Sequence, residues 1–511
     1  MGLSGRDDPP PSEDAPIITN PQGKATFLDL PNEILFLVCE FVDLAGLRRL
    51  VRSCRRLTAV ALPVYLARHG IRHPETSLFL SPVTLHVLRL LALARPVPST
   101  QSLYCRFEAA SLPEDIRALH LFVLNSPVVK ELTLDFRGVH SAAVSMPGSG
   151  RCGVADAIQD TLDNVLASGC ESLTILDGVL FSAKYARSSS DRSRDGLWSS
   201  LGCQFVRYLD ERGWSSNAPT QKLKTFNIHS TMMLLPPFVE QTMRILRSNP
   251  HLSDLLLDSS QFPSEDWDKI LPNITLPCLR KFSINIVRHD LDPPAKQHIV
   301  VRAVFAFVSR HSTITEFRCL DPCDPTGVER PRSMLPLLAS LDAGPAYITH
   351  LLDTPDAFPH LQRISISLPP IFDDFVSLRD ALSAIGQRPT DIALCIQLPT
   401  LRHDLLSWLS FGLGEDPAAR VERSLHCVKK LELHVRTVAR SFVSSAQHAL
   451  PAWLSLFPEL RSLEIDEYSL PFLSMDAKRS FVQLLSDSCP KLNAVKLQRE
   501  EHDVHTWLTM Q

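Results

Sequence analysis

The chain has 511 residues and a mass of 57.0 kDa, and its 44% hydrophobic and 21% charged residues are ordinary for a globular protein with a large core. Its formal net charge of −4 and pI near 6.5 exclude the strongly basic balance typical of proteins that bind nucleic acid or anionic membranes. The sequence has no run of 18 apolar residues and no secretory signal pattern, so we expect no membrane partner.

The twelve cysteines are scattered along the chain. The closest pair, Cys319 and Cys323, has no second pair and no histidine partner at the spacing of a zinc site. We therefore expect reduced thiols, no metal and no cofactor, in a protein of the cytoplasm, the nucleus or both.

The first part of the chain divides into a tail and a helical segment. Residues 1–24 hold five prolines and few large apolar side chains, which predicts a disordered tail. Residues 25–68 show three short helical patterns, in which Pro31 suits the start of the first helix, and Asp43 and Ser53 are expected to cap the second and third. The apolar residues of this segment outnumber what three short helices can bury, which indicates a partner.

Between Leu28 and Tyr65 the positions that define the pattern are Leu30, Pro31, Glu33, Ile34, Leu35, Val38, Phe41, Leu47, Leu50, Ser53, Cys54, Arg56 and Leu57. They resemble the F-box motif of many fungal F-box proteins with leucine-rich tails, except that many members have Trp where this chain has Leu57. The resemblance implies that the segment binds the Skp-type adaptor of a cullin-RING ubiquitin ligase. The residues implied in that contact are Leu30, Pro31, Ile34, Leu35, Val38, Leu47 and Leu50.

Residues 69–97 continue the apolar helical pattern and are interpreted as a helical connector. From about residue 98 one pattern recurs, a helical stretch followed by Leu-x-x-Leu-x-Leu or its apolar equivalents. Its copies are Val129-Leu132-Leu134, Leu173-Leu176, Leu223-Phe226-Ile228, Leu252-Leu255-Leu257, Leu279-Phe282-Ile284, Ile314-Phe317-Cys319, Leu361-Ile364-Ile366, Val428-Leu431-Leu433, Leu460-Leu463-Ile465, Leu492-Val495-Leu497 and a weaker copy at Leu394-Ile396 with Asp391 in the first slot.

The repeat has a direct physical interpretation. Its last two apolar residues lie two apart and so share one face of an extended strand, while helices such as 238–247, 298–309 and 478–486 precede it. Stacked units bury both elements, which predicts an α/β fold: a curved parallel sheet backed by helices over residues 98–511. The copies resemble the irregular leucine-rich repeats of F-box proteins, with uneven spacing and with polar loops expected at 185–196 and 321–332.

Catalytic signals are weak. Residues 148–153, GSGRCG, fit a dinucleotide-binding G-x-G-x-x-G that precedes a helical pattern at 154–166 and an acid at Asp177. However, Ser145-Met146-Pro147 separates this motif from the preceding weak strand pattern, and the strand before Asp177 is already explained as one repeat among many. No nucleophile elbow or metal-binding H-E-x-x-H occurs, so we expect no catalytic residues.

With no catalytic signal of weight, the function that the sequence favours is binding through an exposed surface of the sheet. The residue between the two inward positions of a strand, and the residue after them, are expected on the concave side: Arg318, Glu432, His434, Glu464, Asp466, Lys496 and Gln498. A mixed-charge face suits protein recognition. We therefore expect a non-catalytic substrate receptor of an SCF-type ubiquitin ligase that binds an unidentified target protein. The alternative is an interaction scaffold outside any ligase, with the helical segment as its cap.

Overall fold

The computed structural model describes residues 27–93, 100–126, 128–139, 150–177, 222–235, 238–259, 262, 266–286, 294–320, 325–331, 334–368, 375–398, 425–435, 450–465, 475–497 and 500–504. The expectations for the tail 1–24 and the loop 185–196 fall outside these residues. The chain forms two compact units. We call Met1–Arg72 with Leu93–Arg95 the helical unit, and His73–Ala92 with Pro96–Gln511 the sheet unit.

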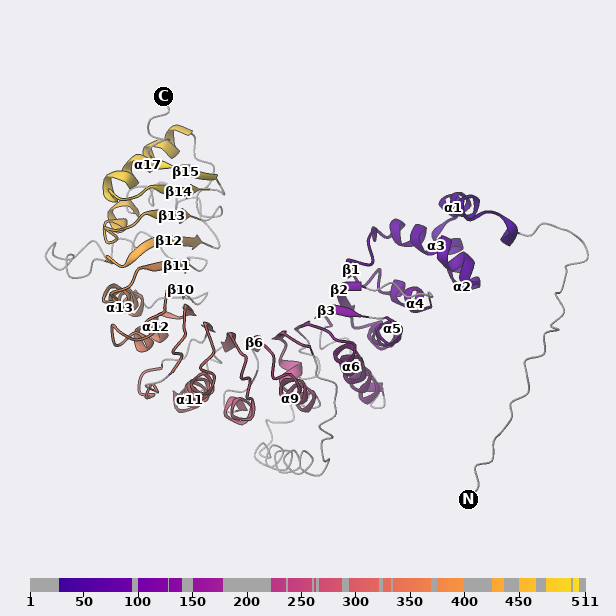
Figure 1. Ribbon diagram of the computed structural model, residues 1–511, viewed down its shortest axis with the longest axis horizontal. Helices are drawn as coiled ribbons and strands as arrows, with labels where there is room; N and C mark the ends of the chain where they lie inside the picture. The colour runs from indigo at the N-terminus through magenta and orange to yellow at the C-terminus, as the bar shows by residue number, and fades with distance from the viewer. Residues whose placement is uncertain are drawn as a thin grey trace, which may run out of the picture. The chain divides into compact units, whose positions relative to one another are not determined.

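The helical unit contains the three predicted helices, after a short turn of 3-10 helix, η1 (Phe27–Asp29). They are α1 (Asn32–Phe41), α2 (Leu44–Ser53) and α3 (Arg55–Arg68). Helices α1 and α2 both pack on α3 (Figure 1). The side chains that close this small core include Leu35 and Cys39 of α1, Leu47 and Val51 of α2, and Tyr65 of α3, each no more than 2% exposed.

Of the three predicted helix starts, that at Asp43 is confirmed, that at Pro31 is one residue early, since Pro31 is the N-cap and not the first helical residue, and that at Ser53 is wrong. Pro31 directly precedes α1, and Asp43 caps α2 because its side chain accepts a hydrogen bond of 2.8 Å from the Gly46 N–H. The prediction for Ser53 was wrong. It is the last residue of α2, and its hydroxyl donates to the Leu50 carbonyl instead of capping α3, whose N-cap is Cys54.

Two arginines of α3 hold the neighbouring turns of the helical unit. Arg56 donates to the Leu28 and Leu30 carbonyls and, at 3.0 Å, to the Asn32 side chain. Arg68 donates to the Glu40 and Val42 carbonyls at the end of α1. Their guanidinium groups thus donate to backbone carbonyls at or just beyond the ends of η1 and α1, where the last carbonyls of a helix have no partner within the helix.

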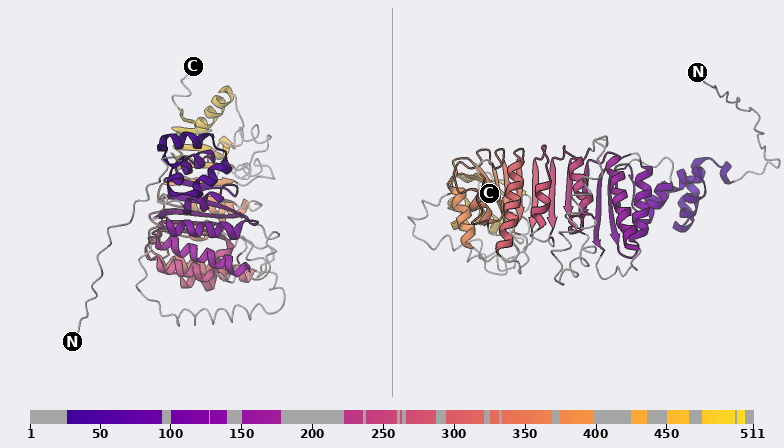
Figure 2. Two further views of the ribbon diagram at one scale, coloured as in Figure 1. Left: turned by 90° about the vertical axis from the view of Figure 1, so that its right-hand side faces the viewer. Right: turned by 90° about the horizontal axis from the view of Figure 1, so that it is seen from below.

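The sheet unit is built on one sheet of fifteen strands in the described residues, arranged in chain order from β1 to β15 (Figures 1 and 2). The first fourteen strands are parallel, and β15 pairs with β14 in the antiparallel sense. The strands are β1 (Ser77–Leu80), β2 (Thr100–Glu108), β3 (Val129–Gly138), β4 (Ser172–Leu176), β5 (Thr225–His229), β6 (Asp254–Ser259), β7 (Lys281–Ile286), β8 (Glu316–Leu320), β9 (Ser340–Ala343), β10 (Arg363–Ser367), β11 (Ile392–Leu398), β12 (Val428–Val435), β13 (Ser462–Ile465), β14 (Ala494–Leu497) and β15 (Glu500–Asp503).

Helices connect successive parallel strands and line one face of the sheet (Figure 1). Those described are α4 (His86–Leu93), α5 (Leu112–Asn125), α6 (Gly150–Ala167), η3 (Thr231–Leu234), α9 (Val239–Ser248), α10 (Trp267–Ile270), η5 (Leu271–Asn273), α11 (Pro294–Arg310), α12 (Pro345–Leu351), α13 (Phe375–Gly386) and α17 (Met475–Ser488). The predicted class, an α/β fold with a parallel sheet backed by helices, is therefore confirmed, and it is compatible with a curved solenoid.

The core of the sheet unit consists of two apolar rows that run across the strands on the helix side. Neighbours in register form the first row, from Leu78 and Leu103 to Val495, and the second, from Leu80 and Cys105 to Leu497. Ring contacts add to the first row: Phe282 stacks on Phe317 with centroids 6.0 Å apart. Because each strand contributes to both rows, no single repeat can bury its apolar face without its neighbours.

The repeat copies lie on the strands, with three corrections. In β4 the buried pair is Leu173 and Ile175, so Leu176, which we had placed in the core, faces the other side. Strand β9 was missed, because its inward residues Leu341 and Ala343 include a side chain too small to complete the pattern. The connector predicted at 69–97 contains β1 as well as α4, so the sheet begins at Ser77 rather than near residue 98.

The second predicted loop is described only at residues 325–331. There Val328 is buried, and Arg330 forms an ion pair of 2.7 Å with Asp353, so this part makes fixed contacts with the fold.

His311, at the predicted end of helix α11, is one of the buried polar anchors of the sheet unit. Its ring is 2% exposed, its Nε2 accepts a hydrogen bond of 2.9 Å from the Leu276 N–H, and its Nδ1 lies 2.7 Å from the Phe307 carbonyl. These partners define a neutral ring that carries its proton on Nδ1. Burial lowers the pKa of His311 below its ordinary value.

We expect His311→Ala to lower the free energy of unfolding by about 2–3 kcal/mol, because it removes two buried hydrogen bonds and leaves the Leu276 N–H without an acceptor. As pH falls, His311 is protonated at a higher pH in the unfolded chain than in the folded chain. The contribution of His311 should therefore be lost as pH falls below about 6.5, and the difference between wild type and variant should narrow. Denaturant unfolding at pH 7.5 and 5.5 checks this, with exposed His360→Ala as the control. A difference that does not change with pH would contradict the assignment.

Candidate functional site

The face of the sheet opposite the helices, which we call the open face, carries two rows of mostly polar side chains. The middle row takes the residue between the two inward positions of each strand, and the second row takes the residue after them. The middle row reads Phe79, Tyr104, Thr133, Thr174, Asn227, Leu256, Ser283, Arg318, Asp342, Ser365, Cys395, Glu432, Glu464 and Lys496.

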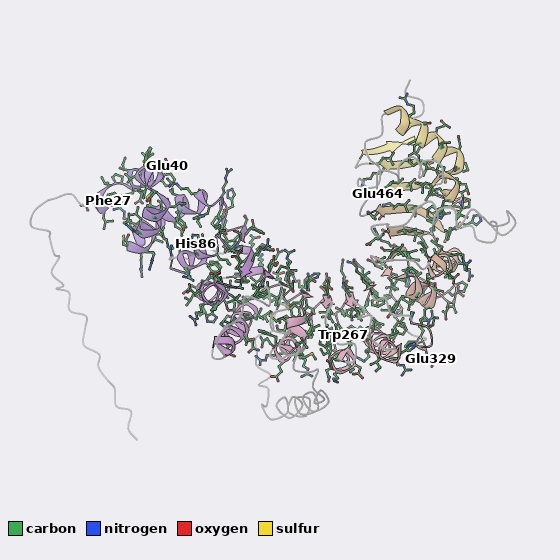
Figure 3. The ribbon with its side chains drawn as sticks, turned by 180° about the vertical axis from the view of Figure 1, so that it is seen from behind. Phe27, Glu40, His86, Trp267, Glu329 and Glu464 are labelled. Carbon is green, nitrogen blue, oxygen red and sulfur yellow. The ribbon has the colours of Figure 1, made fainter. Side chains whose placement is uncertain are left out.

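The structure places five of the seven predicted surface residues on this open face. Arg318, Glu432, Glu464 and Lys496 belong to the middle row, and His434 belongs to the second row, opposite Gln397 (Figure 3 labels Glu464). Asp466 and Gln498 lie outside the described residues. A role in binding for these side chains stays a prediction.

Charged side chains of the open face pair across neighbouring strands. Arg318 Nε lies 3.0 Å from Asp342 Oδ2, and Lys496 Nζ lies 2.6 Å from Glu464 Oε1. Ion pairs of this kind, between side chains in contact with solvent, contribute little individually, about 0–1 kcal/mol each. Their main effect is to order the side chains of the face.

Glu432 is the exception, because its side chain is only 8% exposed. Lys430 Nζ lies 2.8 Å from its Oε1 and Arg363 Nη2 lies 2.7 Å from its Oε2. Burial alone would raise the pKa of Glu432, but the hydrogen bond from Lys430 and the nearby positive charges outweigh it and hold the pKa below its ordinary value. The carboxylate is therefore ionised and anchored from both sides.

A hollow opens on the open face above β9 to β12. The residues that line it are Ser340, Asp342, Arg363, Ser365, Cys395, Gln397 and His434. Polar side chains of the hollow are held by hydrogen bonds: Asp342 accepts from the neighbouring Ser367 hydroxyl at 2.7 Å, and the Gln397 amide donates to Ser365 at 3.1 Å. The hollow is a polar recess in a broad surface.

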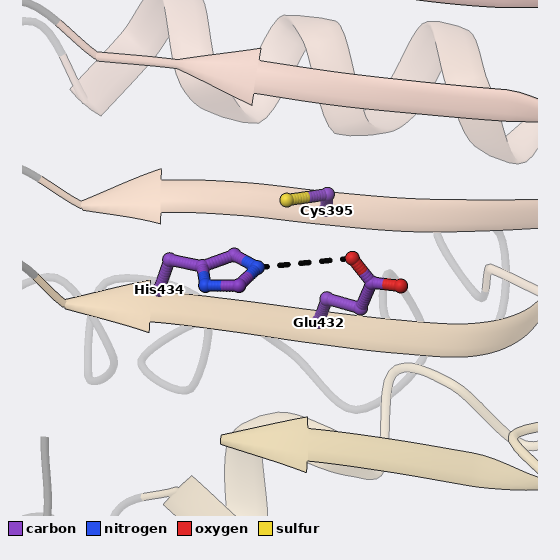
Figure 4. Close-up of side chains that lie close together, drawn as sticks. All are labelled: Cys395, Glu432 and His434. Carbon is purple, nitrogen blue, oxygen red and sulfur yellow. Dashed lines mark ion pairs between the residues drawn. The ribbon is translucent and has the colours of Figure 1, made fainter. Parts of the chain in front are cut away.

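Three side chains of metal-ligand type meet at this hollow. Cys395, Glu432 and His434 each offer one ligand atom, and these atoms all lie within 4.8 Å of one another (Figure 4). Cys395 and Glu432 are register partners on β11 and β12, and His434 follows Glu432 by two residues on the same face. Burial, followed by the neighbouring carboxylates of Glu432 and Asp342, raises the pKa of the Cys395 thiol.

A second cluster occupies the open face over β1 to β3. The Phe79 ring is 63% exposed and stacks on Tyr104 with centroids 4.4 Å apart and planes 13° apart. The Tyr104 hydroxyl donates to the buried Asp135 carboxylate, which also accepts from Arg137 at 2.7 Å, while Arg106 lies 4.0 Å away. We call these five residues the aromatic–arginine cluster.

Asp135 holds this cluster together. Its side chain has no exposed surface, so burial alone would raise its pKa, but hydrogen bonds from Arg137 and Tyr104 outweigh burial and hold the pKa below its ordinary value. One ionised carboxylate thus fixes the positions of a phenol and a guanidinium on the open face. Large aromatic and arginine side chains are the residue types that most often anchor protein interfaces.

The helical unit has an apolar surface of its own. Helix α1 buries Leu35 and Cys39 but exposes Ile34, Val38 and Phe41, and Phe41 is 89% exposed. The exposed residues lie four and three apart, so they form one stripe along the helix. Of the residues expected at an adaptor contact, Leu35 and Leu47 are fully buried inside the unit, and Leu30 and Leu50 are partly exposed.

Sequence reasoning missed the aromatic–arginine cluster and the hollow. Phe79 and Tyr104 belong to strands that the repeat search did not find, although the pairs Leu78/Leu80 and Leu103/Cys105 fit the same alternation. Cys395 occupies the same position of its repeat as Arg318 and Glu432, which we did select, whereas Arg363 precedes the first inward residue of its strand and lies in neither row. Extending the two-row rule to every strand would have found Phe79, Tyr104, Asp135 and Cys395, but not Arg137 or Arg363.

The nucleotide hypothesis gains nothing from the fold. Gly148 and Ser149 lie outside the described residues, Gly150 is the first residue of α6, and Asp177 follows β4 with its N–H donating to the His229 carbonyl at 2.7 Å. A helix between two neighbouring parallel strands also connects β5 to β6 and β7 to β8, so this arrangement is the general repeat of the unit.

In comparisons with known proteins, the chain matches no family model and no curated protein. Across the described parts of the chain, no helix combines the length and the apolar composition needed to cross a membrane. The cysteines within the described residues are free thiols, eight of nine at least partly covered and Cys278 exposed.

We expect Asp135→Ala to lower the free energy of unfolding by about 2–4 kcal/mol, since it leaves the Tyr104 hydroxyl and the Arg137 guanidinium without their buried acceptor. Denaturant unfolding measures the change. Glu114→Ala is the matched control, because Glu114 also accepts from an arginine, Arg89 at 2.6 Å, but is 66% exposed and should cost about 1 kcal/mol or less. Equal costs for the two substitutions would mean that Asp135 does not organise the cluster.

Proposed function

We propose that this protein is a substrate-recognition subunit of an SCF-type cullin-RING ubiquitin ligase in the cytoplasm or nucleus. The helical unit would act as an F-box that binds a Skp-type adaptor, and the sheet unit would act as an irregular leucine-rich-repeat domain that binds a target protein. The chain itself would carry no catalytic residue. Its contribution is to raise the effective concentration of a target lysine near a ubiquitin-charged enzyme.

The exposed apolar stripe of α1 is the observation that carries the proposal. The apolar face of α1 that carries Leu35 and Cys39 is buried within the helical unit. A second apolar face of the same helix, formed by Ile34, Val38 and Phe41, is exposed. Five further large apolar side chains of the helical unit are exposed, on η1, elsewhere on α1 and at the start of α2. They are Phe27, Leu28, Phe36, Leu37 and Leu44, each 41–51% exposed. Contiguous apolar surface of this kind usually marks a site of protein association.

The buried positions refine the proposed contact. Leu35 and Leu47 are fully enclosed by the helical unit, so they support the fold rather than touch a partner. The adaptor would contact Pro31, Ile34 and Val38 of the expected set, together with Phe41, while Leu30 and Leu50 would lie at the edge. Substitutions at Leu35 or Leu47 would unfold the unit and would say nothing about binding.

The open face of the sheet unit is the proposed target surface. It offers a broad array of ordered polar side chains with an aromatic anchor at one end, Phe79 on Tyr104, and a hollow beside Arg363. Such an array fits the surface of another protein better than a small metabolite, which is usually enclosed in a mostly apolar cavity.

We expect the double substitution Ile34→Asp with Phe41→Asp to abolish co-elution with a Skp-type adaptor in size-exclusion chromatography, whereas wild type co-elutes one-to-one. Both side chains are exposed, at 43% and 89%, so the helical unit should stay folded. Loss of two interface anchors worth about 2 kcal/mol each weakens binding roughly a thousandfold.

The matched control is Leu121→Asp with Leu124→Asp on helix α5, because both leucines are 53% exposed but belong to the sheet unit. It should keep adaptor binding. If wild type fails to bind, or if the α1 variant binds as well as the control does, the ligase proposal is wrong.

The second candidate, an interaction scaffold outside any ligase, rests on the open face alone. It makes a different prediction for the same proteins: the α1 stripe would then stabilise the chain itself. In that case Ile34→Asp with Phe41→Asp would lower the melting temperature of the isolated protein, while no adaptor would bind wild type.

A further inference from the structure

The cluster of Cys395, Glu432 and His434 has no part in the proposed ligase function. Its members come from two adjacent strands whose backbone positions are fixed by the register of β11 with β12. Cys395 and Glu432 are 3% and 6% exposed, and His434 Nε2 lies 3.7 Å from Glu432 Oε2 at the edge of the hollow (Figure 4). The scaffold therefore holds three different ligand atoms together on rigid strands.

We propose that these three side chains form a binding site for a divalent zinc ion. Thiolate, imidazole and carboxylate are the ligands that Zn²⁺ takes in proteins, and three protein ligands with one open position are typical of sites that exchange water or a further ligand. The fourth position would face the hollow lined by Asp342, Arg363 and Gln397. Water or a side chain of a bound protein would complete the coordination there.

The distances fit this chemistry after small adjustments. Zinc–ligand bonds of about 2.0–2.3 Å place the atoms of a tetrahedral set roughly 3.3–3.6 Å apart. The three ligand atoms here lie within 4.8 Å of one another, and the pair formed by His434 and Glu432 is at 3.7 Å. Coordination would require the Cys395 and His434 side chains to rotate toward Glu432. On coordination the Cys395 thiol releases its proton to water and its sulfur forms the bond to zinc.

Arg363 competes with the metal. Its guanidinium occupies Glu432 Oε2, the oxygen that faces His434, while Lys430 holds the other oxygen at 2.8 Å. Arg363 is 51% exposed, so it can turn into solvent at little cost and leave Oε2 to the ion. The site would therefore have two states: in one Arg363 occupies Glu432 Oε2, and in the other zinc does. This competition can be tested, because removal of Arg363 should raise the affinity for zinc.

The test uses the full-length protein after removal of metals with a chelator. Zinc affinity is measured by competition with a chromogenic chelator, and cobalt substitution reports the ligands, since a Co²⁺–thiolate bond gives an intense sulfur-to-metal absorption band. We expect one ion per chain with that band. Cys395→Ser should abolish the band, and Cys395→Ser and His434→Ala should each weaken zinc binding by at least about 100-fold.

Cys278→Ser is the matched control for adventitious binding, because Cys278 is an exposed cysteine whose sulfur lies 4.0 Å from His251. It should leave the affinity and the spectrum unchanged. His434→Ala keeps the test valid if the buried Cys395→Ser variant does not fold, since the His434 side chain is 36% exposed.

Removal of the competitor should strengthen binding. We expect Arg363→Ala to raise zinc affinity by about tenfold, whereas Arg318→Ala, which removes a positive charge from the same face but not from Glu432, should change it less than threefold. A cobalt complex without the sulfur band, a loss of binding in Cys278→Ser, or weaker binding in Arg363→Ala would each overturn the proposal. The outcome is independent of adaptor binding, which resides in the helical unit.

Discussion

The parallel register of the sheet is the constraint on which the sheet unit depends. Each parallel strand places two apolar side chains on the helix side, and hydrogen bonding to its neighbours aligns these into continuous rows from β1 to β14. A slip of one residue in any strand would move its apolar pair to the open face and its charged residues into the core. The register therefore decides both stability and recognition, since the residues between the inward positions form the open face.

The two units solve the same problem of burial in different ways. A repeat of the sheet unit leaves its apolar faces to the next repeat. At the end of the described sheet, the antiparallel strand β15 pairs with the backbone edge of β14. The described part of the helical unit has three α-helices, whose buried side chains include Leu35, Leu47 and Tyr65. What remains on α1 is surplus, and surplus apolar surface is the physical basis for expecting a partner.

The sequence predicts the two apolar rows well because their pattern recurs in many repeats. It predicts poorly the features that occur only once, such as a single helix cap or a contact between distant side chains. Leu252-Leu255-Leu257 and its relatives gave strand positions and the buried face, whereas Leu176 was misplaced because a leucine follows the true inward Ile175. Ser53 was expected to cap α3 on residue type alone, but the chain between α2 and α3 is too short to spare it from α2. Pairs such as Arg363 with Glu432, 69 residues apart, depend on register across two strands and have no local signal.

The charges of the open face bear on how it could recognise a protein. Arg318 and Lys496 are each matched by a carboxylate on a neighbouring strand, and Arg363 is matched by Glu432 two strands away, so these cations add little unbalanced charge for long-range attraction. Affinity must then come from side chains that are ordered before binding and from the few that offer apolar contact, above all Phe79. A partner that covers these ion pairs without offering polar groups to them would lose binding free energy to desolvation. This loss favours selective binding over non-specific binding.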